Sequence, residues 1–198
     1  ANYATNKNKI LENFEVAIES GVSMIQIREK KLSARLLFEL TSEAVARKKK
    51  SLTQILVNDR ADVALAAKAD GVHLTSTSIN TAVIRQNFPL EFTIGVSSHS
   101  IDEIKNTKRD GANFVVFSPI FPTPAKEKYG EAKGIYELEK AIESVGDFPI
   151  IALGGINIDN FSDLINSGAH GIAAIRLFSK TEKLAETILQ IRNFKKEN

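Results

Sequence analysis

Short apolar runs and longer amphipathic stretches alternate along the whole chain. The apolar runs are rich in valine and isoleucine and have the length of β-strands. They span residues 23–29, 54–59, 71–75, 92–98, 114–120, 149–156 and 171–177. Between them apolar residues recur at helical spacing, most clearly in residues 33–48, 100–112 and 158–169. This alternation predicts an α/β fold in which helices cover a parallel sheet.

The number of repeated units narrows the fold further. Seven or eight β-α units in 198 residues favour a (β/α)8 TIM barrel over an open doubly wound sheet. No linker or low-complexity tract interrupts the pattern, so we expect residues 1–198 to form a single domain. A clear first strand is missing: residues 1–5 supply a short one, or the chain starts after it.

Composition and charge exclude several classes of function. The chain is 43% hydrophobic and 25% charged, with a net charge of +2 that gives no footprint for nucleic acid. The basic run at residues 47–50 is interpreted as the solvated end of a helix. The absence of cysteine excludes disulfides, thiolate catalysis and cysteine metal sites. No apolar run has the length of a membrane span and no signal peptide is recognisable, so we expect a cytoplasmic protein without nucleic-acid or membrane partners. Its oligomeric state, including a homo-oligomer, stays open.

In a barrel of this kind, ligands bind at the carboxyl ends of the strands. In residues 23–30, a period of two places Gln26, Arg28 and Lys30 on one face, while Ile25 and Ile27 point to the helices. Unpaired cations at the barrel mouth are costly unless an anion meets them, and Arg with Lys suits phosphate oxygens. The alternative is an internal salt-bridge network with Glu29 or Asp59.

The next strand ends in Asn58 and Asp59. A carboxylate beside an amide at a barrel mouth can hold Mg²⁺ through one protein oxygen, leaving the other positions to water and substrate phosphate. Asp59 could equally be the N-cap of the helix predicted over residues 60–69. The residues alone leave these two interpretations open.

Residues 92–103 carry a run of hydroxyl groups. Ser100 and Glu103 have the spacing of a capping box, so Ser100 is assigned to helix capping, whereas Ser97 at the strand end is free for a ligand. His73, His99 and His170 are not at metal-ligand spacing, and each is interpreted as a packed or surface residue.

Residues 118–134 form the longest polar loop, with three prolines and with Lys126 near its middle. Such a loop over a barrel mouth is a candidate lid, and a simple surface crossing is the alternative. Beyond it, Gly154 and Gly155 offer backbone N–H groups, and the last predicted strand ends at Arg176. Glycines at this position permit a phosphate to approach the backbone, although tight packing also explains them. The mouth therefore has two separate zones suited to anions.

These segments resemble thiamine phosphate synthase and its relative the thiazole tautomerase. The resemblance runs from Gly21 to Phe178 and is carried by six motifs in the same order. They are "IQIREK", "VNDRADVALAAKADGVHL", "IGVSSHS", "SPIFPTPAK", "ALGGI" and "GAHGIA". The family is a (β/α)8 barrel. The synthase joins a hydroxymethylpyrimidine diphosphate to a thiazole phosphate and releases pyrophosphate.

The resemblance implies a role for each residue of the mouth. The pyrimidine diphosphate would contact Gln26, Arg28, Lys30 and Asn58. Asp59 would bind Mg²⁺, the implied cofactor, Ser97 would touch the leaving group and Lys126 would close over it. The thiazole phosphate would be held by Thr123, Ala125, Gly155, Ile175 and Arg176. Arg28, Ser97 and Lys126 are the implied catalytic residues.

Three positions depart from the family pattern. The synthase motif "HLGQxD" supplies a second Mg²⁺ ligand where this chain has Ser78, for which we expect an N-cap role at the helix starting near residue 79. Ala125 stands where a hydroxyl is usual, and Arg176 where a small residue is usual. A neutral hydroxyl binds Mg²⁺ less well than a carboxylate, so we expect a weakened metal site.

Two other functions compete with the synthase. The tautomerase catalyst is a histidine at the end of the sixth strand, where this chain has Pro119, which argues against that reaction. The other is a non-catalytic protein that binds thiazole phosphate or thiamine phosphate without turnover. The synthase is favoured by the complete set of Gln26, Arg28, Lys30, Asn58, Asp59 and Lys126, because this set of residues has no purpose without a diphosphate.

Overall fold

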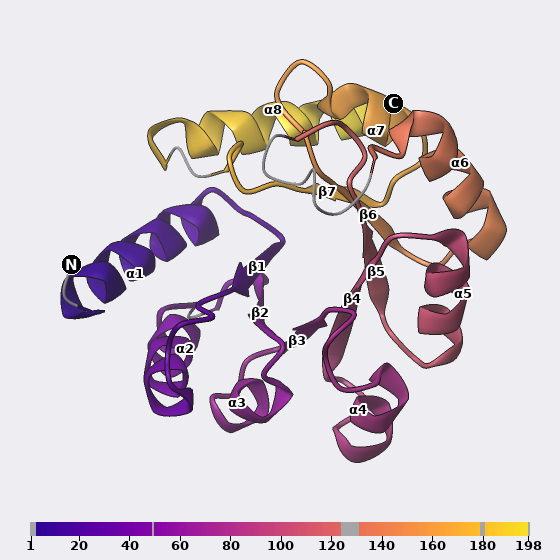
Figure 1. Ribbon diagram of the computed structural model, residues 1–198. Helices are drawn as coiled ribbons and strands as arrows, with labels where there is room; N and C mark the ends of the chain where they lie inside the picture. Colours follow the sequence, from indigo (N-terminus) through magenta and orange to yellow (C-terminus); the bar gives the residue numbers. More distant parts are fainter. Residues whose placement is uncertain (1–2, 49, 124–130, 179–180, 198) are drawn as a thin grey trace.

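The computed structural model describes residues 3–48, 50–123, 131–178 and 181–197. Within these ranges, helices and parallel strands alternate from the first element to the last, as predicted (Figure 1). In chain order the elements are α1 (Tyr3–Glu19), β1 (Met24–Ile27), α2 (Ala34–Lys48), β2 (Gln54–Asn58), α3 (Ala61–Ala66), β3 (Gly71–Leu74), α4 (Thr81–Asn87), β4 (Thr93–Ser98), α5 (Ile101–Arg109), β5 (Phe114–Phe117), α6 (Gly134–Val145), β6 (Ile150–Leu153), α7 (Phe161–Asn166), β7 (Gly171–Ala173), the 3-10 helix η2 (Thr181–Lys183) and α8 (Leu184–Glu197).

The seven strands form one parallel sheet in the order β1 to β7. The sheet is curled and the helices lie around its outer face (Figure 1), so the architecture is TIM-barrel-like. A doubly wound sheet would reverse its strand order and carry helices on both faces, which this sheet does not. In the described ranges no strand joins β7 to β1, and α1 and α8 contact each other instead.

The N-terminal segment is helical where a short strand was one of the two expectations. Residues 3–5 already belong to α1, so within the described chain they supply no strand. α1 packs on α2 and α8, and the Arg192 guanidinium donates to the Gly21 carbonyl just after α1. This helix therefore takes its place in the outer ring.

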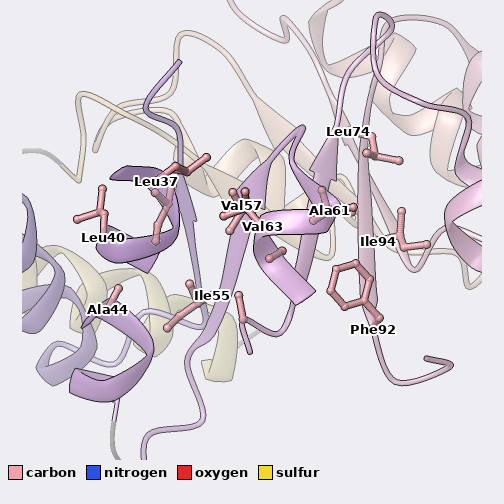
Figure 2. Close-up of a cluster of buried hydrophobic side chains, with 14 of the residues drawn as sticks. Leu37, Leu40, Ala44, Ile55, Val57, Ala61, Val63, Leu74, Phe92 and Ile94 are labelled. Carbon is pink, nitrogen blue, oxygen red and sulfur yellow. The ribbon is translucent and has the colours of Figure 1, made fainter. Parts of the chain in front are cut away.

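Alternation along the strands separates two hydrophobic layers, because successive side chains point to opposite faces. One layer fills the space between strands and helices, and Figure 2 shows part of it, with Ile55 and Val57 of β2 meeting Leu37 and Leu40 of α2. The other lies on the inner face of the sheet. Its members are Met24, Leu56, Phe114, Val116, Ile151 and Leu153. Residues in register with these inner positions therefore point into the barrel.

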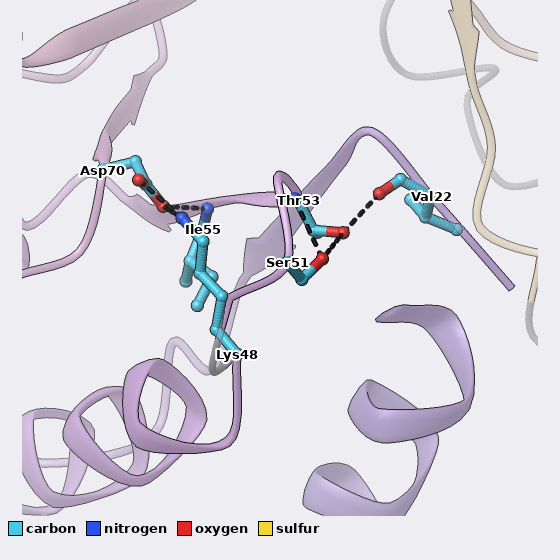
Figure 3. Close-up of polar contacts among 6 residues, drawn as sticks. All are labelled: Val22, Lys48, Ser51, Thr53, Ile55 and Asp70. Carbon is cyan, nitrogen blue, oxygen red and sulfur yellow. Dashed lines mark hydrogen bonds and ion pairs between the residues drawn. The ribbon is translucent and has the colours of Figure 1, made fainter. Parts of the chain in front are cut away.

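Polar contacts tie the amino ends of the first three strands together (Figure 3). The Asp70 carboxylate accepts hydrogen bonds from the Ile55 N–H at 2.7 Å and from Lys48 Nζ at 2.7 Å. Thr53 Oγ1 donates to the Val22 carbonyl at 2.7 Å. Lys48 is thus a helix-end lysine, as predicted, but it is paired rather than only solvated. These contacts lie at the end opposite the strands' carboxyl ends, where a barrel is stabilised and not where it binds ligands.

Candidate functional site

The carboxyl ends of β1 and β2 bring together two amides. Gln26 Nε2 donates to Asn58 Oδ1 at 3.1 Å across the two strands. Ile25 and Ile27 pack in the helix-facing layer, so Gln26 lies on the inner face as the alternation predicted. Asn58 is buried and Gln26 is exposed, so the pair is open toward the mouth of the barrel.

Arg28 and Lys30 follow directly after β1, and both are exposed. In the described part of the chain neither forms an ion pair, so the alternative of a network with Glu29 or Asp59 is wrong there. Two cations that follow this amide pair, without an ion-pair partner among the described residues, suit an anion with several oxygens.

Asp59 turns the chain sharply at the end of β2. Its φ is 65°, a conformation that residues other than glycine rarely adopt, and its N–H donates to the His73 carbonyl at 2.9 Å. The residue preceding α3 is Arg60, and its side chain pairs with Asp62, a contact that lowers the pKa of that carboxyl. Asp59 is therefore not the N-cap of α3, and its exposed carboxylate is available to a ligand.

Ser78 does not cap α4, so that prediction is wrong. The N-cap is Asn80, whose side chain accepts from the Ala82 N–H at 2.8 Å. Ser78 Oγ instead accepts from the Thr75 N–H at 2.8 Å and lies 3.2 Å from Thr75 Oγ1. The hydroxyl closes a turn after β3.

The donors at this edge fit a magnesium ion shared with a ligand. No group of three or more His, Cys, Asp or Glu that could hold a metal occurs among the residues that the structure describes. Asp59 directly follows Asn58 at the carboxyl end of β2 and supplies one exposed carboxylate. Mg²⁺ in phosphate-binding sites commonly uses one or two carboxylates, with water and phosphate oxygens completing its six positions. The chain therefore suits Mg²⁺ that arrives with a diphosphate.

His73 lies inside the barrel beside Ser97, a contact that was not predicted from the sequence. Its Nε2 lies 2.9 Å from Ser97 Oγ, and its ring meets the Phe114 ring edge-on at 6.4 Å between centroids. Burial, and to a smaller extent the charge of Arg28, lowers the pKa of the His73 imidazole from 6.5 to about 4. The imidazole is therefore neutral at pH 7. Strand periodicity carried the signal, because it places residues 71 and 73 of β3 on one face.

The other hydroxyl and histidine residues of this region have structural contacts. Ser100 Oγ accepts from the Glu103 N–H at 3.2 Å, so its predicted capping role is confirmed. His99 Nδ1 lies 2.7 Å from the Ser118 carbonyl oxygen and links the ends of β4 and β5. Ser97 is left as the hydroxyl of this run that faces the barrel interior, beside His73.

Tight packing accounts for the two glycines after β6. Gly154 and Gly155 have φ values of 110° and 68°, and a Cβ on Gly155 would lie 2.5 Å from Phe121 Cβ. The Phe121 N–H donates to the Gly154 carbonyl at 3.0 Å, and the Lys133 N–H donates to the Pro119 carbonyl at 2.9 Å. The loop after β5 is thus fastened to the loop after β6 at the barrel mouth.

The residues predicted to hold the second phosphate are only partly described. Thr123 Oγ1 is buried and has no hydrogen-bond partner within the described ranges. Ala125 and Lys126 lie in residues 124–130, outside those ranges. β7 ends at Ala173, three residues before the predicted strand end at Arg176, so Ile175 and Arg176 lie in an exposed turn beyond it.

No helix within the described ranges is long and apolar enough to cross a membrane.

Comparison with known proteins agrees with the resemblance seen in the motifs. The family model described as thiamine monophosphate synthase matches residues 1–178. A putative thiamine-phosphate synthase 2 of Aquifex aeolicus is 38% identical over 178 residues, covering 88% of this chain and 94% of that protein. A thiamine-phosphate synthase of Archaeoglobus fulgidus is 38% identical over 185 residues, covering 91% and 86%.

A solved structure extends the comparison to three dimensions. A thiamine phosphate pyrophosphorylase from Pyrococcus furiosus has a TM-score of 0.83 at 30% identity, covering 94% of this chain and 89% of that chain. These matches cover most of this chain and agree with its fold and with the residues at the carboxyl ends of β1 and β2. The chain therefore belongs to the thiamine monophosphate synthase family.

Proposed function

We propose that this chain makes thiamine phosphate from a hydroxymethylpyrimidine diphosphate and a thiazole phosphate, with Mg²⁺ bound together with the diphosphate. The observation that carries the proposal is the cluster at the ends of β1 and β2. There the Gln26–Asn58 amide pair is followed, just after β1, by the exposed Arg28 and Lys30, which make no ion pair in the described chain. This cluster matches the charge and the many acceptor oxygens of a diphosphate.

The diphosphate is the group on which charge builds as the reaction proceeds. Its bond to the pyrimidine methylene carbon breaks, the electron pair leaves with pyrophosphate, and the thiazole nitrogen forms the new bond to that carbon. Arg28 and Lys30 neutralise the leaving oxygens, with Ser97 and Lys126 as further donors. Asp59 would hold Mg²⁺, which when bound would supply further charge neutralisation there. Gln26 and Asn58 orient the pyrimidine diphosphate.

The thiazole phosphate is assigned to the loops after β5, β6 and β7. The buried Thr123 hydroxyl, which lacks a partner in the described chain, supports this assignment, since a buried donor without an acceptor is costly. The resemblance assigns the Gly155 backbone to this subsite, next to Phe121, and the exposed Arg176 supplies a charge. The resemblance assigns Ala125 and Ile175 to the same subsite and Lys126 to the diphosphate; Ala125 and Lys126 lie outside the described residues.

A magnesium titration tests the proposal. Thiamine phosphate formation is measured for the wild type and for Ser78→Asp, which restores a carboxylate where the synthase motif has its second Mg²⁺ ligand. We expect turnover in both, with half-maximal activity at a lower Mg²⁺ concentration in Ser78→Asp. No product from folded protein at any Mg²⁺ concentration would overturn the proposal. If calorimetry then showed thiamine phosphate binding, a non-catalytic binding protein would replace it.

A further inference from the structure

The side chains of β3, β4 and β5 enclose the imidazole of His73 on the inner face of the sheet. His73 is in register with Gly95 of β4, and Gly95 is in register with Phe114 of β5. The His73 and Phe114 rings therefore meet above a residue without a side chain, at an interplanar angle of 80°. A Cβ on Gly95 would lie 2.2 Å from the Phe114 ring. The missing side chain at Gly95 thus makes the room in which both rings sit.

Ser97 lies two residues beyond Gly95 on the same face, and so one layer closer to the mouth. His73 is only 8% exposed, and its ring makes an edge contact with the Phe114 ring. Its Nε2 is 2.9 Å from Ser97 Oγ. A serine hydroxyl rotates freely unless a neighbour holds it, and here a rigid, buried nitrogen does so.

The direction of this hydrogen bond decides what Ser97 offers to a ligand. A hydroxyl has one hydrogen and two lone pairs, whereas the oxygens of an ionised diphosphate only accept. If His73 accepted the Ser97 hydrogen, the serine would turn lone pairs toward the anion. If His73 donates through Nε2–H, the serine hydrogen is free to point at a phosphate oxygen.

We propose that His73 is a positioning residue for Ser97: its Nε2–H donates to Ser97 Oγ and directs the serine hydrogen toward the diphosphate. The inference rests on the proposed contact between Ser97 and that group. Both the neutral Nε2–H tautomer and the imidazolium donate in this direction. Only the neutral Nδ1–H tautomer reverses the bond.

A double-mutant cycle tests the coupling between the two side chains. We expect Ser97→Ala to lower kcat about 100-fold, as for loss of one donor to a developing anion. His73→Asn, whose amide reaches only as far as Nδ1, lowers kcat about 10-fold, with KM for the pyrimidine diphosphate changed less than about 3-fold. His73→Gln, whose amide nitrogen reaches the place of Nε2, restores kcat to within about 3-fold of the wild type.

The double variant Ser97→Ala/His73→Asn has the kcat of Ser97→Ala alone, because the histidine acts only through the serine. Val116→Ala is the matched control: Val116 is buried and in register with Ser97, but its side chain has no hydrogen-bonding group. Its effect multiplies with that of Ser97→Ala. If the losses of kcat in His73→Asn and Ser97→Ala multiplied in the double variant, the inference would be overturned. An unchanged kcat in Ser97→Ala would overturn the proposed Ser97 contact itself.

The tautomer gives a second test that needs no variant to be active. In protein labelled with ¹⁵N-histidine, a long-range ¹H–¹⁵N spectrum with Mg²⁺ and inorganic pyrophosphate shows which ring nitrogen carries hydrogen. The His73 signals are assigned by their loss in His73→Gln. We expect a protonated Nε2. A protonated Nδ1 with a bare Nε2 overturns the inference.

Discussion

The buried imidazole of His73 makes folding sensitive to mild acid. In the folded chain its pKa is lowered from 6.5 to about 4, chiefly by burial and also by the charge of Arg28. The unfolded chain therefore binds a proton between pH 6.5 and about pH 4 that the folded chain does not. Neutral His73 therefore makes its full contribution to the free energy of unfolding above pH 6.5. This contribution is lost as the pH falls from 6.5 to about 4.

The size of this effect follows from the two pKa values. Each pKa unit corresponds to about 1.4 kcal/mol, so lowering the pH from 7 to 5 removes about 2 kcal/mol from the free energy of unfolding. For a chain of this length, that corresponds to a fall in Tm of about 4–8 °C. Urea denaturation at pH 7, 6 and 5, followed by circular dichroism, measures the loss.

The matched control is His73→Gln, which keeps a polar side chain but cannot gain a proton. We expect its stability to change about 2 kcal/mol less than that of the wild type over the same pH range. An equal pH dependence in the two proteins would show that the imidazole stays solvated in the folded chain, and would refute this account of its burial.

Three further predictions concern the two ends of the barrel. Asp70→Ala removes the acceptor of the Ile55 N–H and the partner of Lys48, so we expect the free energy of unfolding, measured by urea denaturation, to fall by about 2–3 kcal/mol. For Asp70→Asn we expect a fall of about 1 kcal/mol. Two variants as stable as the wild type would contradict the structural role of Asp70. Gly71→Ala places a Cβ 1.9 Å from the Thr93 carbonyl oxygen, and we expect it to lower the free energy of unfolding by at least about 3 kcal/mol. Gly171→Ala meets only the end of the Ile151 side chain at 3.3 Å, and we expect a loss of less than about 1 kcal/mol. Similar Tm values for the two variants would count against the pairing of β3 with β4. We expect Arg28→Ala and Asp59→Ala each to lower kcat/KM about 100-fold or more, with the free energy of unfolding unchanged within about 0.5 kcal/mol. The control Arg35→Ala, on the exposed surface of α2, leaves kcat/KM unchanged. Wild-type rates in Arg28→Ala or Asp59→Ala would refute the assignment of the site.

The strands were predictable because each is a short apolar run rich in β-branched residues, bounded by polar or glycine-containing turns. All seven observed strands lie inside the predicted segments. The predicted ends extended too far where apolar residues continue past the hydrogen-bonded ladder, as at Arg176 beyond β7. Composition sets which residues can form a strand, but the neighbouring strand sets where pairing stops.

The errors at helix starts have a different cause. Ser78 and Asn80 are both good N-cap residues two positions apart, and the choice depends on which backbone is extended, as it is at Asn80. Asp59 also has a favoured capping side chain, but its positive φ turns the chain away before α3 begins. Local sequence could not distinguish these cases, because packing of the strand ends decides the backbone path.

The placement of side chains on the inner face was predicted where it depends on strand periodicity, but contacts that depend on strand register were not predicted. Gln26 follows from alternation within one strand. The contact of His73 with Ser97 depends on how β3 and β4 align and on the absence of a side chain at Gly95 between the rings. That information is distributed over three strands.

The central claim is that this chain couples two phosphorylated substrates. The most direct test incubates the purified protein with the pyrimidine diphosphate, the thiazole phosphate and Mg²⁺, and quantifies thiamine phosphate and pyrophosphate together. The account predicts equal amounts of both products, formed only when both substrates are present. Pyrophosphate without thiamine phosphate, or neither product from folded protein, would contradict it.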